Sequence, residues 1–371
     1  MLILGIETSC DETAIAFLSA KKEKNKFIFT PLSNIVSSQI KIHRKFGGVV
    51  PKLACRAHSE NIDFVLKEAL KEASGDQKSY KEFLQNIDLI ATTNRPGLEI
   101  ALLIGVNFAR ALSWYLEKPL IGVSHLEGHL LSFLLPSLKE EKIFLEKEKK
   151  EIFPALALIV SGGHTLLVAV KDFSKYKIIG QTLDDAAGEC FDKGARILGL
   201  KYPGGPEIAK LAKNFREKSK NKKEVSLKLP RPMINSSDFN FSFSGLKTAL
   251  LYTYQKLTPS ERKKKREQLA YELEEAITDV LVKKSFKAIE KFSFKSLILG
   301  GGVSANQRLR EKILEEQKKY PFLKIFFPQI QYSLDNALMI ALAGFFNYDN
   351  RKRKELILNF KKIKVEANKF F

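Results

Sequence analysis

The chain has 371 residues, of which 44% are hydrophobic and 10% aromatic, enough to build one large or two ordinary folded domains. Its three cysteines are odd in number and far apart, and its start, MLILGIETSC, lacks a signal-peptide pattern, so we expect a cytoplasmic protein without a disulfide framework or membrane span. The net charge of +20 favours binding to a polyanion such as nucleic acid, although a genome base composition that favours lysine codons would give the same excess.

The first third of the chain predicts a β-rich unit followed by helices. Residues 2–6, 14–18 and 27–36 are typical of strands, and a polar turn over 7–13 joins the first two. A helix over 51–73, a strand over 88–93 and an apolar helix from 97 to about 116 follow. A short strand over 120–123 then leads into the segment SHLEGHLL, residues 124–131.

Two of the five histidines lie in that segment. His125 and His129 are four residues apart, so a helix places them on one face. Imidazoles placed in this way can bind one metal ion, with a third ligand from elsewhere in the chain. The alternative is a helix face with two hydrogen-bonded structural histidines, and the spacing alone favours that alternative.

The pattern of the opening returns after a charge-dense segment. Residues 137–151 predict a surface excursion between two lobes. Strands over 155–160, 166–170 and 176–182 follow, with a tight Ser-Gly-Gly-His-Thr turn over 161–165, and then a helix over 186–198. A second β-turn-β unit followed by a strand and a helix indicates an internal duplication of the fold.

The remainder alternates helices with short strands. A helix starts at the Pro-Gly-Gly-Pro of 203–206, a second charged excursion covers 213–224, a polar-aromatic loop covers 238–247, and Thr258 with Glu261 predicts the cap of a long helix. A strand over 296–299 precedes Gly300-Gly301-Gly302, and Ser304 with Gln307 predicts a capping box. A strand over 324–327 leads to a closing helix after 336, and we expect the basic tail from 351 to be solvated and partly mobile.

Glycine-bearing turns at 161–163 and 300–302 expose backbone N–H groups that suit a phosphate or a nucleotide. In duplicated lobes such turns resemble the actin, heat-shock-protein and sugar-kinase ATPase fold, in which a nucleotide cleft lies between two ribonuclease-H-like lobes. The expected fold class is therefore α/β with two such lobes, residues 1–135 with 334–371 and residues 136–333. No Walker A motif or GxGxxG fingerprint is present in the sequence.

Nine motifs stand in the order found in the bacterial tRNA adenosine threonylcarbamoyltransferase family, the TsaD type, formerly called the O-sialoglycoprotein endopeptidase family. The resemblance runs from residue 2 to about residue 346. The motifs are GIETSCDET (5–13), GGVVPKLACRAH (47–58), HLEGH (125–129), LIVSGGHT (158–165), DDAAGECFDK (184–193), YPGGP (202–206), FSFSGLKT (241–248), GGVSAN (301–306) and SLDNALMIA (333–341).

This resemblance implies transfer of a threonylcarbamoyl group from threonylcarbamoyl-AMP to the exocyclic amine of adenosine 37, in tRNAs that read codons beginning with A, with release of AMP. It also implies one divalent metal ion, usually described as iron, with zinc or magnesium as alternatives. The implied metal ligands are His125, His129 and Asp335. The implied substrate-binding residues are Ile159, Val160, Ser161, Gly162, Gly163, Asp192, Gly205 and Asn306.

Two carboxylates in the first turn are candidates for catalysis. Asp11 or Glu12 would deprotonate or orient the attacking amine, unless both merely accept hydrogen bonds from turn amides. Cys10 is expected to be a packed thiol, because no histidine is near it in sequence and the donor is already activated.

Three other functions are open. A metalloprotease of the H-E-x-x-H type would need a glutamate where Leu126 stands, which argues against proteolysis. A small-molecule kinase or ATPase of the same fold, and a non-catalytic paralogue acting as a binding subunit, are the remaining alternatives. The resemblance also implies tRNA, a related non-catalytic paralogue and a small ATPase as partners. The basic runs 262–266 and 351–354 are candidates for tRNA contact, and the helix of 98–116 for a protein interface.

Overall fold

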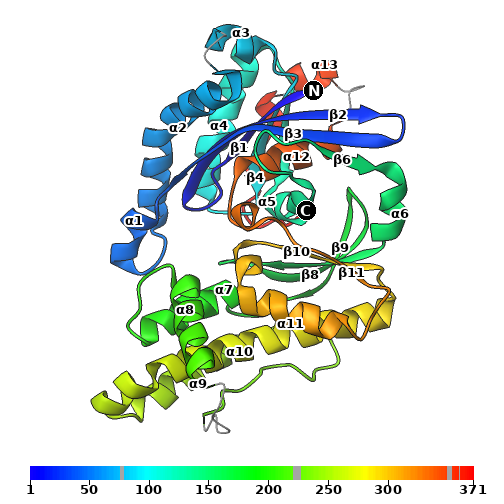
Figure 1. The fold of residues 1–371 in the computed structure, drawn as a ribbon. Coiled ribbons are helices and arrows are strands. Elements are labelled where there is room, and N and C mark those ends of the chain that lie inside the picture. The colour runs from blue at the N-terminus through cyan, green and yellow to red at the C-terminus, as the bar shows by residue number, and fades with distance from the viewer. Residues whose placement is uncertain (76–78, 220–226, 349–352, 359) are drawn as a thin grey trace.

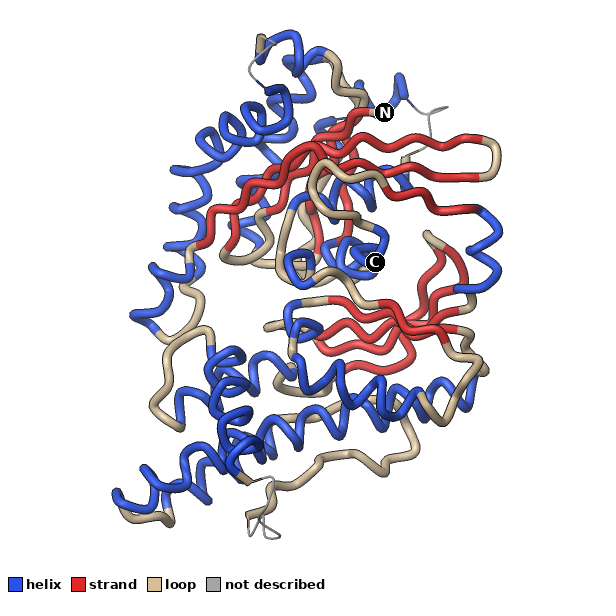
Figure 2. Tube along the Cα trace, in the orientation of Figure 1, coloured by secondary structure: helices blue, strands red, loops and turns tan. Residues whose placement is uncertain are grey.

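Two mixed β-sheets organise the chain, and helices lie outside and between them (Figure 1). The computed structural model describes every residue except 76–78, 220–226, 349–352 and 359. Figure 2 shows the strands as two separate groups, with helical segments filling the space between the groups.

The first sheet has six strands in the order β5-β4-β1-β2-β3-β6, and the second has five in the order β11-β10-β7-β8-β9. In both sheets three consecutive antiparallel strands are followed by two parallel ones on the side of the first strand. The predicted internal duplication is therefore confirmed. The strands are β1 (Leu2–Glu7), β2 (Glu12–Glu23), β3 (Lys26–Ser38), β4 (Leu89–Arg95), β5 (Leu120–Ser124), β6 (Lys142–Leu145), β7 (Ala155–Val160), β8 (Thr165–Asp172), β9 (Lys175–Gln181), β10 (Ser296–Gly300) and β11 (Lys324–Phe326).

The helices match the predicted ones to within a few residues where both exist. The long helix α10 begins with the predicted capping box, in which Glu261 N donates to Thr258 Oγ1 and Thr258 N to Glu261 Oε2. The helices are α1 (Ile40–His43), α2 (Pro51–Ser74), α3 (Tyr80–Gln85), α4 (Glu99–Leu116), α5 (His125–Leu131), α6 (Lys149–Ile152), α7 (Ala187–Ile197), α8 (Gly204–Lys218), α9 (Ser244–Gln255), α10 (Pro259–Phe292), α11 (Gln307–Gln317), α12 (Ala337–Asn347) and α13 (Arg353–Leu358).

Each sheet has a hydrophobic core on both faces. Successive side chains of a strand point to opposite sides, so one strand contributes to two cores. In β1, Ile3 faces a central core that also contains α5 and α12, whereas Leu4 faces an outer core under α2, α3 and α4. In β7, Ala157 faces the same central core and Leu158 faces the outer core under α7, α9 and α10. The order of layers is thus helices, sheet, central helices, sheet, helices.

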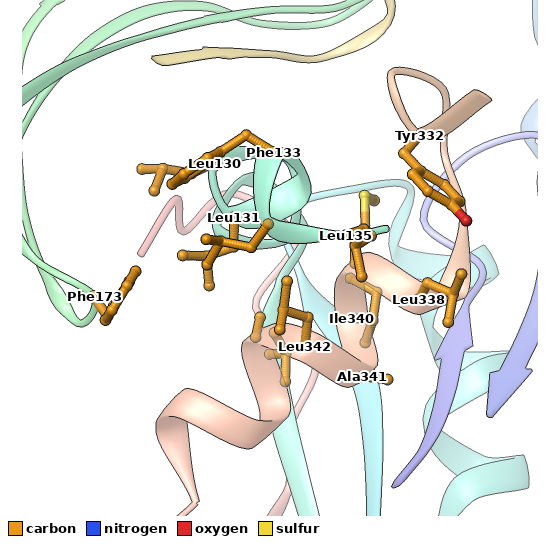
Figure 3. Close-up of a cluster of buried hydrophobic side chains, with 14 of the residues drawn as sticks. Leu130, Leu131, Phe133, Leu135, Phe173, Tyr332, Leu338, Ile340, Ala341 and Leu342 are labelled. Carbon is orange, nitrogen blue, oxygen red and sulfur yellow. The ribbon is translucent and has the colours of Figure 1, made fainter. Parts of the chain in front are cut away.

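The central helices hold the two sheets together. Leu130 and Leu131 of α5 belong to the same buried cluster as Leu338, Ile340 and Leu342 of α12. Figure 3 shows Leu131 and Leu342 facing each other between the two helices. Helix α12 packs on β1 and β2 of the first sheet, and α5 packs on β10 and β7 of the second. The histidine segment therefore lies at the junction between the sheets.

Three predictions from the sequence are wrong in part. The charged segment over 137–151 contains β6, which pairs with β3 at the edge of the first sheet. Of the second charged excursion, residues 213–218 complete α8, and 220–226 lie outside the described residues. The cap of α11 is Asn306, whose Oδ1 accepts from Leu309 N, and Ser304 lies in a preceding 3₁₀ turn.

The tail also differs from the prediction. Its residues 351 and 352 are outside the described part, but the stretch 363–371 is not free in solvent: Glu366 N donates to Asn94 O, and Gly97 N donates to Ala367 O. Phe370 and Phe371 pack against the central core. Aromatic packing at the far end of the basic tail outweighs its charge.

Contrary to the prediction of no membrane span, helix α4 is long and apolar enough to cross a membrane by length and composition. One such helix is a weak indication, since a core helix passes the same test. Here α4 packs on β4 and α2. The division into lobes at 135 and 334 stays a prediction, with β6 of the second segment lying in the first sheet.

Candidate active site

Two histidines of helix α5 and an aspartate far along the chain meet between the sheets. The Nε2 atoms of His125 and His129 lie 3.5 and 3.1 Å from Asp335 Oδ1, and one ligand atom from each residue lies within 4.8 Å of the others. The histidine rings are 4.6 Å apart between centroids and nearly perpendicular. Both imidazoles are buried, and Asp335 remains 19% exposed, so the carboxylate is the part of the group that solvent reaches most easily.

Local structure fixes where these side chains point. Strand β5 runs directly into α5, so the first helical residue is His125, and the second histidine follows one turn later on the same face. A Cβ at Gly300 would lie 2.7 Å from His129 O, so only glycine lets β10 approach the histidine helix this closely. Asn336 caps α12 by accepting from Met339 N, and this turn sets the direction of Asp335 immediately before it.

The charges of the three groups are coupled. Burial opposes protonation of His125, yet the carboxylates of Asp335 and Glu7 raise its pKa to about 9. Burial and the neighbouring His125 lower the pKa of His129. Burial alone would raise the pKa of Asp335, but the two histidines hold it well below its usual range. The Asp335 carboxylate therefore stays ionised and favours a positively charged partner.

The donor set fits a divalent cation. Two imidazole nitrogens and one carboxylate oxygen converge on one point, and such a set with open positions suits iron(II) and related ions. Nδ1 of His129 is buried without a hydrogen-bond partner among the described residues. The protein's own hydrogen bonds therefore do not saturate this imidazole.

Sequence reasoning missed one carboxylate at this site. Glu7, at the end of β1, is fully buried, and its Oε2 lies 2.9 Å from His125 Nδ1. Burial would raise the pKa of Glu7, but the adjacent His125 lowers it on balance. The signal was a charged residue at the end of an otherwise apolar strand, five residues before the carboxylate chosen as a catalytic candidate, Glu12.

A second missed residue is His164, in the turn between β7 and β8. Burial, followed by the charges of His125 and His129, lowers its pKa to about 4, so it stays neutral beside the triad. Its ring meets Phe370 edge-on at 5.6 Å, and Ser124 Oγ donates to Phe370 O. The tail therefore reaches the residue that precedes His125, on the side of the site where His164 lies.

The turn with the two catalytic candidates lies near the triad. Burial, followed by the charges of Asp11 and Asp335, raises the pKa of Glu12 well above its usual value. His58 holds this turn through Thr13 Oγ1 at 2.8 Å and Cys10 O at 3.0 Å. Burial, aided by nearby carboxylates, also raises the pKa of the Cys10 thiol, so the thiol stays protonated, as expected for a packed residue.

The predicted phosphate turn has the expected form. Ser161 N donates to His164 O at 2.8 Å, and His164 N donates to Ser161 Oγ at 3.2 Å. Gly162 and Gly163 are exposed, whereas the side chains of Ile159 and Val160 are buried, so the latter two can offer only backbone atoms. Gly188 N, at the start of α7, donates to Ser161 O, which brings that helix N-terminus to the turn.

The remaining predicted substrate residues have structural partners. Asp192 Oδ1 accepts from Gly204 N at 2.6 Å and so caps α8, next to the open position of Gly205. Asn306 caps α11 and donates through Nδ2 to Glu274 Oε1 at 2.8 Å. Asp192 and Asn306 therefore stabilise helix N-termini, and their roles in binding a substrate stay predictions.

The larger of the two described cavities lies away from these residues. Its volume is about 560 Å³, and its lining combines aromatic rings such as Phe173 and Phe346 with lysines such as Lys22 and Lys149. None of the predicted site residues lines it.

The fold and the site together define a class. Duplicated three-plus-two sheets with helices between them are the architecture of the actin-like ATPase fold, here with a candidate metal site at the junction. A solved structure, HypF of T. kodakarensis, matches with a TM-score of 0.56 at 13% identity, over 98% of this chain and 48% of that one. This likeness confirms the fold.

Sequence relatives then identify the family. The profile of TsaD, described as tRNA N6-adenosine threonylcarbamoyltransferase, matches residues 30–342. Proteins with that name from Thermosipho melanesiensis and Syntrophomonas wolfei are each 46% identical, over 94% and 96% of this chain and 95% and 96% of their own. One from Endomicrobium trichonymphae is 44% identical over 99% of this chain and 97% of its own. The chain belongs to the TsaD family.

Proposed function

We propose that this chain transfers the threonylcarbamoyl group of threonylcarbamoyl-AMP to the exocyclic nitrogen of adenosine 37 in tRNAs that read codons beginning with A, releasing AMP. The observation that carries the proposal is the coincidence of near full-length family similarity with a His125–His129–Asp335 group at the junction of the sheets. The relatives' name favours a transferase over a small-molecule kinase or a non-catalytic subunit.

The proposed reaction is an acyl transfer. The adenosine nitrogen attacks the carbonyl carbon of the threonylcarbamoyl group, a carbon–nitrogen bond forms, and the bond from that carbon to the phosphate oxygen breaks. AMP leaves with the electron pair, and the amine proton passes to a carboxylate. The raised pKa of Glu12 supports its role as this base, because a carboxylate with a raised pKa accepts a proton more readily near neutral pH. Asp11 is the second candidate.

The donor is proposed to lie against the C-terminal sheet. Ser161 N and Gly188 N already donate within the protein, so the exposed Gly162 and Gly163 of the turn would offer their N–H groups to the phosphate, beside the start of α7. Gly205 leaves open space beside the capped start of α8, which would admit part of the adenylate. Ile159, Val160, Asp192 and Asn306 would contribute through backbone atoms or through the helix ends that they hold.

One divalent ion, with iron proposed first and zinc or magnesium as alternatives, would be held by His125, His129 and Asp335. The ion would supply Lewis-acid polarisation of the donor.

The proposed partners follow from charge and exposed apolar surface. tRNA would lie on basic faces such as the start of α10, where Lys263 and Lys264 are exposed, while Arg262 and Arg266 donate to backbone carbonyls. The run 351–354 lies largely outside the described residues.

A related non-catalytic paralogue and a small ATPase are proposed as protein partners. Exposed aromatic residues on α2 and α4 offer a surface for the paralogue. These residues are Phe64, Trp114 and Tyr115, at 60%, 69% and 67% exposure. We propose a cytoplasmic location for this assembly.

Product analysis tests the proposal. Purified chain, partner proteins, threonylcarbamoyl-AMP and tRNA are incubated, and the nucleosides of the digested tRNA are separated by mass. We expect threonylcarbamoyl-adenosine only in a tRNA with adenosine at position 37, in a molar amount equal to the AMP released. AMP release without modified nucleoside, or modification of a tRNA that lacks this adenosine, would contradict the proposal.

A further inference from the structure

Glu7 is held rigidly between two strands of the first sheet. Its Oε1 accepts from Ser9 N at 2.5 Å, and its Oε2 accepts from Thr93 Oγ1 at 2.7 Å. Thr93 belongs to β4, the parallel neighbour of β1, and is itself buried. These two hydrogen bonds hold the carboxylate beside His125.

The carboxylate meets the outer nitrogen of His125. The Nε2 atom of this ring faces Asp335, whereas Nδ1 lies 2.9 Å from Glu7 Oε2 and 3.2 Å from Ser9 Oγ. A carboxylate can only accept, so Nδ1 carries the hydrogen and donates it to Glu7. The lone pair of the neutral ring is then on Nε2, the atom that faces Asp335 and the convergence point of the site.

We propose that Glu7 is a positioning residue that fixes the tautomer and the ring orientation of His125 for metal binding. The inference rests on the metal-dependent function proposed above. Carboxylate partners of this kind raise the basicity of an imidazole ligand, and their loss typically lowers metal affinity about 10- to 100-fold.

The two histidines differ in this respect. Nδ1 of His129 has no hydrogen-bond partner among the described residues, so nothing equivalent to Glu7 orients its ring through that atom. His125 is thus the oriented ligand, fastened to the first sheet, and His129 depends on the packing of α5 against β10. Removal of Glu7 therefore takes a hydrogen-bond partner from only one of the two imidazoles.

The test compares Glu7→Gln, Glu7→Ala and Thr93→Val with wild type. Glu7→Gln keeps the size and an acceptor atom but loses the charge, and Thr93→Val leaves Glu7 in place with one donor fewer. The matched control is Glu127→Gln: Glu127 is buried on the histidine helix itself, but its carboxylate accepts from Tyr176 Oη at 2.9 Å and Asn347 Nδ2 at 2.7 Å rather than from an imidazole of the site.

Two readouts apply to the same variants. The first is the dissociation constant for zinc or cobalt, measured by competition with a chelator. We expect it to rise about 10- to 100-fold in Glu7→Ala, less in Glu7→Gln, least in Thr93→Val, and to change by no more than about twofold in Glu127→Gln. The second is the imidazole NMR spectrum of the metal-free chain, in which the Nδ1-bound proton of His125 should resonate far downfield in wild type and be lost in Glu7→Ala.

The outcomes separate this inference from the proposed function. Variants of Glu7 that fold, bind metal as tightly as wild type and keep the downfield resonance would overturn it alone. A wild-type chain that binds no metal would contradict the proposed metal site and this inference with it. If Glu7→Ala does not fold, Glu7→Gln decides, because it preserves the packing volume and keeps one oxygen that can accept from either Ser9 N or Thr93 Oγ1.

Discussion

The buried carboxylate of Glu275 joins three helices of the C-terminal half, and its replacement by glutamine should destabilise the protein strongly. Its oxygens lie 2.7 Å from Arg308 Nε, 2.8 Å from Lys312 Nζ and 3.2 Å from Arg216 Nη2. These cations come from α11 and α8, and the neighbouring Glu274 holds Asn306, the cap of α11. Glu275→Gln keeps the shape and removes only the charge.

The magnitude follows from the pKa. Burial would raise the pKa of Glu275, but Arg308 and Lys312 lower it from 4.5 to about 2. Such a fall corresponds to about 3 kcal/mol of stabilisation at neutral pH, because each tenfold change in proton affinity is worth about 1.4 kcal/mol. A lowered pKa gives stability that is complete above the unfolded value of 4.5 and is lost as the pH falls towards 2.

Urea unfolding followed by circular dichroism, at a series of pH values, measures this directly. The wild type should exceed Glu275→Gln in free energy of unfolding by about 3 kcal/mol at about pH 7, by about half of that near pH 3, and by almost nothing near pH 2. A gap that is independent of pH would refute the reasoning, since it would show that shape rather than charge distinguishes the two side chains.

Three further predictions concern the site. Gly300→Ala should lower stability by about 1–3 kcal/mol and weaken metal uptake, because its Cβ would press on His129 O, whereas Gly245→Ala, with open space around it, should do neither in the same unfolding and metal-content assays. Phe370→Ala should lower stability by about 1–2 kcal/mol and expose the tail to limited proteolysis; an unchanged cleavage pattern would contradict the packing described for that ring. Glu12→Gln should slow transfer about 10²- to 10⁴-fold and abolish the rise of rate with pH that a base with a raised pKa produces; an unaltered pH–rate profile would remove Glu12 from this role.

Periodic and local features were predictable from the sequence. The i, i+4 spacing of His125 and His129 predicted one shared helix face, and the Thr258–Glu261 pair predicted the start of α10. The duplicated β-turn-β pattern predicted two sheets of the same topology. Each of these depends on residues close together in the chain, where spacing fixes geometry.

Features that depend on distant pairing were not predictable in this way. Nothing local to Asp335 indicates that it meets two imidazoles about two hundred residues earlier, and only the family resemblance pointed to it. The role of Glu7 requires knowing that β1 ends beside α5, and the edge strand β6 requires knowing that β3 leaves an edge free. The tail was misjudged because its lysines outnumber the two phenylalanines that decide where it packs.

The most direct test of the account is single-turnover transfer to tRNA by wild type and by Asp335→Ala, each supplied with excess metal and partner proteins. We predict rapid formation of modified adenosine in the wild type, its loss on chelation, and no comparable rate in Asp335→Ala at any metal concentration, with both proteins folded by circular dichroism at the assay temperature. Equal rates in the two proteins would contradict a reaction centred on the two imidazoles and this carboxylate.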